Sequence, residues 1–111
     1  MGAEGGFQGL ARTYTEMGRE KEAIELYNKE LKKGYYYACP YQGLGNVYKK
    51  TGNPAQAEEN LLAVIKIEPF RWKGYYELAQ YYYEIGKLDK AMEFIEKALA
   101  FSDDTLNKPK V

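Results

Sequence analysis

Hydrophobic side chains recur along the chain with the spacing of helices that bury one face. One such stripe, at positions i, i+3, i+4 and i+7, consists of Tyr75, Leu78, Ala79 and Tyr82. The segment after it carries a similar stripe of Ala91, Ile95, Ala98 and Leu99. This spacing predicts helices at residues 4–17, 20–33, 38–51, 54–67, 72–85 and 88–101.

The helical pattern repeats every 34 residues. The glycines that interrupt it lie at Gly18, Gly52 and Gly86. The same step relates three further sets, which are Leu10, Leu44 and Leu78; Tyr14, Tyr48 and Tyr82; and Ala23, Ala57 and Ala91. Four residue classes in phase over three copies indicate three tandem repeats, each made of two helices.

The residues between and within the paired helices fit hairpins. Each interrupting glycine is expected to end the first helix of its repeat in the left-handed conformation. In the middle repeat, Asn53 is the expected N-cap of the second helix and Pro54 its first residue. Small residues recur at Ala11, Gly45, Ala79, Ala23, Ala57 and Ala91. They are predicted to let the two helices of a hairpin approach closely.

This helix–turn–helix repeat resembles the tetratricopeptide repeat over about residues 4–105. The shared positions are an aromatic, a leucine before a small residue, a tyrosine, the glycine, an alanine and a large apolar residue. In the first copy they are Phe7, Leu10, Ala11, Tyr14, Gly18, Ala23 and Tyr27. The chain departs from the family at Glu30, where alanine is preferred. It also departs at Tyr35 and Asp103, where the family prefers the proline that Pro69 supplies.

The resemblance implies an all-α fold, a right-handed α-solenoid of three antiparallel helix–turn–helix hairpins. The repeats are expected at residues 4–37, 38–71 and 72–105. Residues 1–3 are expected to be a start that is disordered or carried over from expression, and residues 106–111 a polar tail.

Composition narrows the classes of function. The chain of 111 residues has 16 basic and 16 acidic side chains, so nucleic-acid or anionic-membrane binding is not indicated. No apolar run approaches the roughly 20 residues of a membrane span, and the start "MGAEGGF" lacks the features of a secretory signal. Cys39 is the single cysteine, so a disulfide within the chain is excluded and a reducing, cytoplasmic location is expected.

Catalytic residues are not apparent. Histidine is absent, which removes the usual metal-ligand sets and the Ser/His and Cys/His pairs. Adjacent carboxylates such as Glu58 and Glu59 point apart on a helix, so they do not flank a substrate. The glycines punctuate the repeats and form no phosphate-binding loop. The sequence therefore predicts no enzyme activity, no cofactor and no metal.

The resemblance also implies that the first helices of successive repeats line a concave groove where partners bind. The residues that it nominates for peptide binding are Gln8, Arg12, Gln42, Asn46, Lys49, Lys73, Tyr76, Gln80 and Tyr83. Amides can bond to a peptide backbone, basic side chains can hold a carboxylate, and tyrosines offer an apolar platform. The expected function is a protein–protein interaction module, an adaptor or scaffold with a protein or peptide partner. An unused, solvated surface is the alternative interpretation of these residues.

One known partner class is disfavoured. Some members of the family that bind chaperones clamp a C-terminal carboxylate with lysine, asparagine and arginine side chains. Lys73 matches one clamp position, whereas Gln8, Arg12, Gly43 and Glu77 stand where other residues are required. We therefore do not expect an Hsp70 or Hsp90 C-terminal tail as the partner.

Two runs of three tyrosines have different expected roles. Tyr82 belongs to the buried stripe with Tyr14 and Tyr48, Tyr81 is expected to pack against a neighbouring helix, and Tyr83 falls on another face. The run at residues 35–37 lies between the first two repeats. It is expected to cover the apolar seam there, with its hydroxyls in water.

Self-association is the alternative function. The last predicted helix carries apolar residues at Met92, Phe94, Ile95, Leu99 and Phe101. In this interpretation the chain is a fragment of a longer array, or it forms a homo-oligomer through its apolar terminal helix. Nucleic-acid binding through tyrosines and lysines is a more distant alternative, because the charge balance opposes it.

Overall fold

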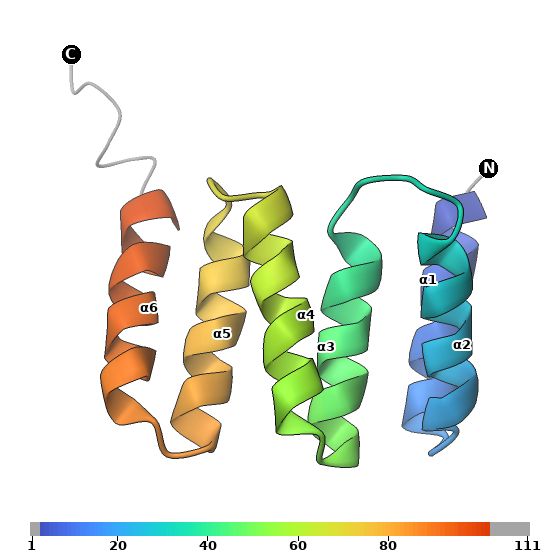
Figure 1. Ribbon diagram of the computed structural model, residues 1–111, viewed down its shortest axis with the longest axis horizontal. Helices are drawn as coiled ribbons and strands as arrows, with labels where there is room; N and C mark the ends of the chain where they lie inside the picture. Colours follow the sequence, from blue (N-terminus) through green and yellow to red (C-terminus); the bar gives the residue numbers. More distant parts are fainter. Residues whose placement is uncertain (1–2, 103–111) are drawn as a thin grey trace. The chain divides into compact units, whose positions relative to one another are not determined.

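The protein is described by a computed structural model that covers residues 3–102, and every regular element in that range is a helix (Figure 1). The helices are α1 (Ala3–Glu16), α2 (Glu20–Leu31), α3 (Cys39–Thr51), α4 (Pro54–Ile67), α5 (Trp72–Glu84) and α6 (Leu88–Ser102). Their bounds lie within two residues of the predicted ranges. The prediction of an all-α fold built from helical hairpins is confirmed.

The chain divides into two compact units. Unit 1 extends to Ile67 and holds α1 to α4, and unit 2 begins at Glu68 and holds α5 and α6. In unit 1, α1 pairs with α2 and α3 with α4, and α3 also contacts both α2 and α1. In unit 2, α5 pairs with α6. Of the predicted segments, residues 1–2, the last residues of the third repeat and the tail at 106–111 lie outside the described range.

The turns between paired helices have the predicted backbone. Gly52 ends α3 with a φ of 79°, in the left-handed region, and its N–H donates to the carbonyl of Lys49. Gly18 and Gly86 have φ values of 83° and 86° at the equivalent positions. A non-glycine side chain would be strained there. The three glycines therefore fix where each hairpin turns.

The start of α4 also agrees with the prediction. Pro54 is its first residue. The N–H of Ala57 donates to the carbonyl of Asn53 at 2.9 Å, which puts Asn53 in the N-cap position. The side-chain amide of Asn53 donates to Oγ1 of Thr51 at 2.8 Å, so it braces the preceding turn.

Small residues bring paired helices into close contact. Ala11, Ala23 and Ala57 are completely buried. A Cβ placed on Gly45 would lie 2.7 Å from Cδ2 of Leu61, closer than two carbon atoms can approach without a shift. The predicted purpose of the small positions is therefore confirmed in unit 1.

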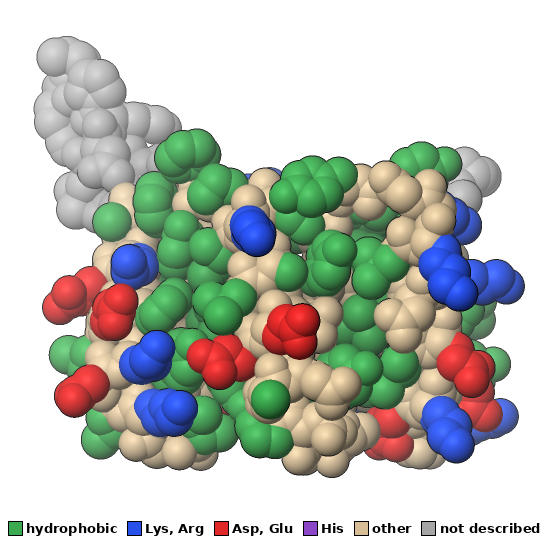
Figure 2. Space-filling view, in the orientation of Figure 1, with side chains coloured by type: hydrophobic (Ala, Val, Ile, Leu, Met, Phe, Trp, Pro, Cys, Tyr) green, Lys and Arg blue, Asp and Glu red, His purple; other side chains and the backbone are tan. Residues whose placement is uncertain are grey.

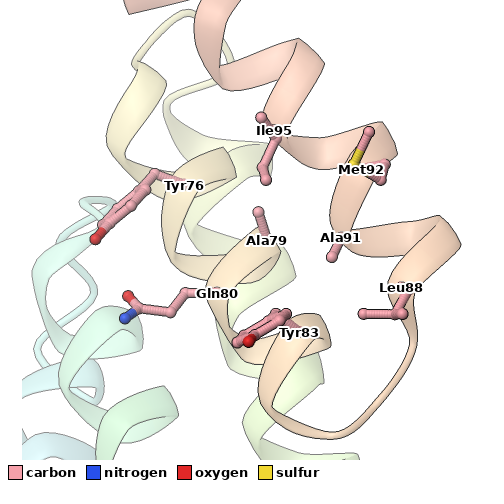
Figure 3. Close-up of a pocket in the computed structure, with 8 residues that line it drawn as sticks. All are labelled: Tyr76, Ala79, Gln80, Tyr83, Leu88, Ala91, Met92 and Ile95. Carbon is pink, nitrogen blue, oxygen red and sulfur yellow. The ribbon is translucent and has the colours of Figure 1, made fainter.

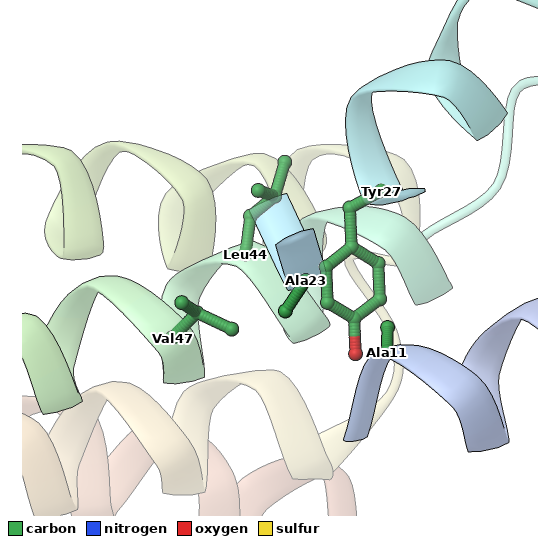
Figure 4. Packing of buried hydrophobic residues seen from close by; sticks show 5 residues of the cluster. All are labelled: Ala11, Ala23, Tyr27, Leu44 and Val47. Atoms are coloured by element: carbon green, nitrogen blue, oxygen red, sulfur yellow. The ribbon is translucent and has the colours of Figure 1, made fainter. Parts of the chain in front are cut away.

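The core of unit 1 is made where α3 packs on the first hairpin (Figure 4). Its buried residues are Ala11 of α1, Ala23 and Tyr27 of α2, and Leu44 and Val47 of α3. Figure 4 shows the Tyr27 ring with its hydroxyl end at Ala11. A Cβ on Gly43 would overlap that ring, so glycine at 43 makes room for Tyr27. The first hairpin and α3 therefore form one packed assembly.

The core of unit 2 is aromatic. Tyr82 and Leu78 are fully buried. The Tyr75 ring stacks on Phe101 with a centroid separation of 5.1 Å, and Tyr82 lies 5.4 Å from Phe94. The Tyr75 hydroxyl donates to the carbonyl of Pro69 at 2.6 Å, which ties the segment before α5 to the hairpin. Aromatic packing of this kind adds to the stability of α5 on α6.

The tyrosine runs follow the predictions in part. Tyr81 and Tyr82 are buried, whereas Tyr83 is 66% exposed, which agrees with the predicted rotation around the helix. Tyr14 and Tyr48 are half-buried, so the stripe that they share with Tyr82 is less enclosed than expected.

The run at 35–37 differs more from its prediction. Tyr35 and Tyr36 are exposed, so they do not cover an apolar seam. The hydroxyl of Tyr37 was expected in water, but it donates to Oε2 of Glu30 at 2.6 Å. The prediction for Tyr37 was wrong because it did not consider that the buried carboxylate of Glu30 needs a donor.

Candidate functional site

The exposed face of α5 forms one wall of a groove in unit 2 (Figure 3). Three of the sequence-predicted binding residues, Tyr76, Gln80 and Tyr83, lie on this wall and are exposed. The groove has a volume of about 510 Å³. These three α5 candidates therefore lie beside an open, ligand-sized hollow.

The opposite wall comes from α6 and is apolar. It consists of Leu88, Ala91, Met92 and Ile95. Leu88, Met92 and Ile95 are large hydrophobic side chains exposed to solvent. In Figure 3, Ala79 and Ala91 lie in the middle of the groove, with the larger side chains of both helices around them. A partner that fills this groove would cover apolar surface on both helices.

The residues predicted for self-association divide between two faces of α6. Met92 and Ile95 line the groove, and Leu99 is exposed close to them in sequence. Phe94 and Phe101 instead pack inward on the aromatic core of unit 2. Of the five residues predicted for self-association, Met92, Ile95 and Leu99 are exposed, and the partly buried Phe101 also lines a hollow beside Lys73.

Lys73 does not line the α5–α6 groove with the other α5 candidates. It is exposed beside Phe70, Arg71, Trp72 and Phe101, at a shallow hollow of about 330 Å³. This hollow adjoins the groove, because the ring of Trp72 lies 5.8 Å from that of Tyr76. The single match to the carboxylate clamp therefore lies next to the groove but outside it.

The remaining candidates form a polar surface on the first helices of unit 1. Arg12 of α1 and Asn46 of α3 are exposed, and Gln8, Gln42 and Lys49 are half-buried. Helices α1 and α3 contact each other, so these side chains belong to neighbouring helices. Arg12 and Asn46 are therefore accessible for polar contacts with a partner.

The sequence analysis did not identify Leu88 as part of the α6 wall, and it did not identify the role of the buried carboxylate of Glu30. Leu88 stands 34 residues after Pro54 and 68 after Glu20, so comparison of the three copies would have marked it as an unusual apolar residue. Glu30 was noted as a departure from the family, but its partners were not identified. They are the Tyr37 hydroxyl and the Lys33 ammonium, the latter at 3.1 Å from Oε1.

These partners lower the pKa of Glu30. The hydrogen bond from Tyr37 is the larger cause and the Lys33 contact the second, and both stabilise the ionised carboxylate. Glu30 thus closes the segment after α2 onto the helix, which is a structural role. It lies in unit 1 and takes no part in the α5–α6 groove.

Charge and metal-ligand chemistry add little to this surface. Figure 2 shows acidic and basic side chains interspersed with hydrophobic patches over α5 and α6. Among residues 3–102, no three His, Cys, Asp or Glu side chains gather as a metal site would require. In the same part of the chain, no helix has the length and hydropathy of a membrane span. The α5–α6 groove is therefore defined by its apolar walls rather than by charged or metal-binding groups.

Comparisons with known proteins agree with the geometry of the hairpins. Models of the tetratricopeptide repeat match residues 7–35 and 43–104, and the second match alone covers more than half of the chain. Among curated proteins, Protein CTR9 homolog of Arabidopsis thaliana is 29% identical over 96 residues. The match covers 83% of this chain and 9% of that protein, so the chain spans less than a tenth of the relative's length.

Proposed function

Because the chain belongs to the tetratricopeptide repeat family, we propose that it is a non-catalytic adaptor or scaffold that binds a partner peptide or helix through its first helices. Repeats of this family generally mediate protein–protein interactions. The residues proposed for contact are those on the exposed faces of α1 and α3 in unit 1 and of α5 in unit 2.

The α5–α6 groove is the observation that carries the proposal. It joins three exposed residues of a first helix to three exposed apolar residues of α6. Hydrophobic patches of this kind, edged by polar groups such as Gln80, are typical of protein-binding surfaces. Tyr76 and Tyr83 add rigid aromatic area, which contributes strongly to binding at interfaces. The groove suits a partner segment with apolar side chains along one face.

The polar surface of unit 1 supports a second kind of contact. Arg12 and Lys49 are basic, and Asn46 can both donate to and accept from a peptide backbone. A partner segment with acidic side chains or a free carboxylate fits this chemistry. Such exposed contacts steer association and select partners more than they add to affinity.

The proposal is tested by partner capture with matched variants. The purified chain is immobilised and exposed to native lysate, and bound proteins are quantified by mass spectrometry. Tyr83→Ala tests the groove and Lys49→Glu tests the polar surface. Tyr36→Ala and Lys50→Glu are the controls, because they make the same substitutions at exposed positions outside the proposed contacts.

We expect the two test variants to lose partners that both controls retain. Circular dichroism of each variant confirms that the helices remain intact. Equal capture by all five proteins would contradict the proposal, because neither surface would then take part in binding.

A further inference from the structure

The α5–α6 groove has a counterpart in unit 1 that is already filled. A shift of 68 residues, two repeats, relates its central residues Ala79, Ala91 and Ile95 to Ala11, Ala23 and Tyr27. In unit 1 these three residues are buried in the core that includes Leu44 and Val47 of α3. The same positions therefore form a surface on which a helix packs.

Exposure shows the difference between the filled and the open groove. Tyr27 is 5% exposed in the presence of α3, whereas its equivalent Ile95 is 42% exposed. Ile24 packs against the core of unit 1, whereas its equivalent Met92 is exposed. The open groove thus presents the surface that a further helix would cover, and α3 shows what such a helix looks like.

The face of α3 that packs on the first hairpin is formed by a few particular residues. Leu44 is 3% exposed and supplies the main apolar contact, next to Val47. Gly43 precedes Leu44 and leaves room for the Tyr27 ring, which any Cβ would overlap. A helix that matches the open groove would therefore carry a leucine at the position of Leu44, with a further apolar side chain one turn later.

The same chain carries a second copy of that face, exposed on α1. Gly9 and Leu10 stand 34 residues before Gly43 and Leu44, and Tyr14 stands 34 before Tyr48. Leu10 is 60% exposed and lines an open hollow of about 260 Å³ together with Tyr14 and Leu26. No atom lies within 4 Å of a Cβ placed on Gly9. The same is true of Gly6, so no described contact requires glycine at either position of α1.

We propose that α1 of a second copy of this chain docks in the α5–α6 groove. This inference rests on the proposed use of the groove as a binding surface and names its occupant. Leu10 of one copy would take the place among Ala79, Ala91 and Ile95 of its partner that Leu44 takes in unit 1. Ile95 lacks the ring atoms of Tyr27 that require glycine at Gly43, so docking depends on Leu10 rather than on Gly9.

The rim of the groove supports an apolar helix as the occupant. Tyr76, Tyr83 and Leu88 replace Gln8, Thr15 and Glu20 of the filled groove, so each polar or short side chain becomes a large apolar one. The wider apolar rim extends the contact that a docking helix makes. On α1, Thr13 stands where α3 has Val47, and its methyl group retains part of that contact.

The geometry of this association is head to tail. The two surfaces are different, and each copy carries one of each, so copies join in a closed ring or in an open chain. The average mass of the purified chain should therefore rise with concentration above that of a single chain. An isologous dimer through α6 alone differs in that Leu10→Glu would not weaken it.

The experiment uses two variants that each remove one surface. Leu10→Glu removes the apolar face of α1 and Ile95→Glu introduces a charge into the groove. Both residues are exposed, so the fold should tolerate the change, and circular dichroism checks it. Leu62→Glu, at an exposed leucine of α4, is the matched control. Met92→Glu replaces Ile95→Glu if that variant does not fold. Masses are measured by sedimentation velocity from low micromolar to near millimolar concentration.

We expect wild type and Leu62→Glu to associate, and each test variant alone to associate at least about tenfold more weakly. An equimolar mixture of Leu10→Glu and Ile95→Glu should form dimers and stop there. The intact groove of the first can hold the intact α1 of the second, and no further copy can add.

Three results would overturn the inference. These are a monomeric wild type at every concentration, wild-type association by Leu10→Glu, and a mixture of the two variants that remains monomeric. The proposed function would survive each of them if Tyr83→Ala still lost partners in the capture experiment, because the groove would then bind another protein. Self-association without any Tyr83-dependent capture would support the inference and leave the second copy as the occupant.

Discussion

The first and third hairpins are built from the same repeat, yet one groove is core and the other is surface. Ala11, Ala23 and Tyr27 of the α1–α2 hairpin are buried with α3. At equivalent positions, Ala91 and Ile95 line the open α5–α6 groove. The repeat residues thus specify a surface that accepts a helix, and the presence of a neighbouring helix decides whether that surface becomes core.

Helix α3, which fills the groove of unit 1, and its repeat equivalent α1 show the same contrast between buried and exposed residues. Leu44 and Leu10 are equivalent, but Leu44 is buried by the first hairpin and Leu10 faces an open hollow. Buried residues of a repeat can therefore be told from exposed ones only when their neighbours are known. Pairs of equivalent residues give a direct way to measure what a neighbouring helix contributes.

The largest expected difference is between Leu44→Ala and Leu10→Ala. Leu44→Ala leaves a cavity in the core of unit 1, so the free energy of unfolding should fall by about 2–5 kcal/mol. Leu10→Ala removes the same atoms from an exposed site, so the change should stay within about 0.5 kcal/mol. Urea unfolding followed by circular dichroism measures both, at low micromolar concentration where association is weak. Similar losses in the two variants would show that Leu10 is buried in solution.

A second pair of substitutions should change stability in opposite directions. Gly43→Ala introduces a Cβ that overlaps Tyr27, and overpacking of this kind costs about 1–3 kcal/mol. That cost exceeds the roughly 0.5–1 kcal/mol that alanine gains over glycine inside a helix. Gly9→Ala meets open space, so it should gain about 0.5–1 kcal/mol in unfolding free energy.

The Leu10 variant also reports on head-to-tail association. Leu10→Ala should leave the stability of the dilute chain within about 0.5 kcal/mol of wild type but weaken its self-association, because it removes the apolar contact with Ala79, Ala91 and Ile95 of the partner. Thermal unfolding at low concentration and sedimentation at high concentration separate the two effects. A Leu10→Ala variant that associates as well as wild type would show that the α1 face is not used in this way.

Much of the fold was predictable because the 34-residue step constrains local structure. The glycines at 18, 52 and 86 fix the turns, and helix periodicity places each element within two residues of its observed bounds. Small residues at Ala11, Ala23 and Gly45 were correctly predicted as close contacts, since no larger side chain fits between packed helices. These features depend on residues near one another in the repeat.

The candidate site was less predictable because it depends on which surfaces remain uncovered. Tyr76, Gln80 and Tyr83 were found from the repeat, but the α6 wall at Leu88 was not. Phe94 was predicted with Ile95 as a residue for self-association, but its ring packs 5.4 Å from that of Tyr82. When a helix has two apolar faces, the spacing of its apolar residues identifies both faces. It does not say which of the two faces meets the core.

The smallest expected effect concerns Glu30, whose equivalent in the third hairpin is Ala98. Glu30 is buried, and the Tyr37 hydroxyl and Lys33 lower its pKa from the ordinary value of 4.5. A carboxylate with a lowered pKa stabilises the fold at pH values above 4.5, and this contribution is lost as the pH falls through the lower, folded-state pKa. The first hairpin should therefore lose stability in acid through a group that the third hairpin lacks.

Glu30→Gln tests this contrast. At pH 7 the variant should unfold at a lower temperature than wild type, because the amide replaces the charged acceptor of the Tyr37 and Lys33 contacts. As the pH falls below 4.5 and through the lowered pKa of folded Glu30, the two midpoints should converge, since wild-type Glu30 becomes neutral as well. Glu93→Gln, the same change at an exposed position of α6, is the matched control. A constant difference between wild type and Glu30→Gln from pH 7 to pH 3 would mean that the carboxylate charge does not stabilise the first hairpin.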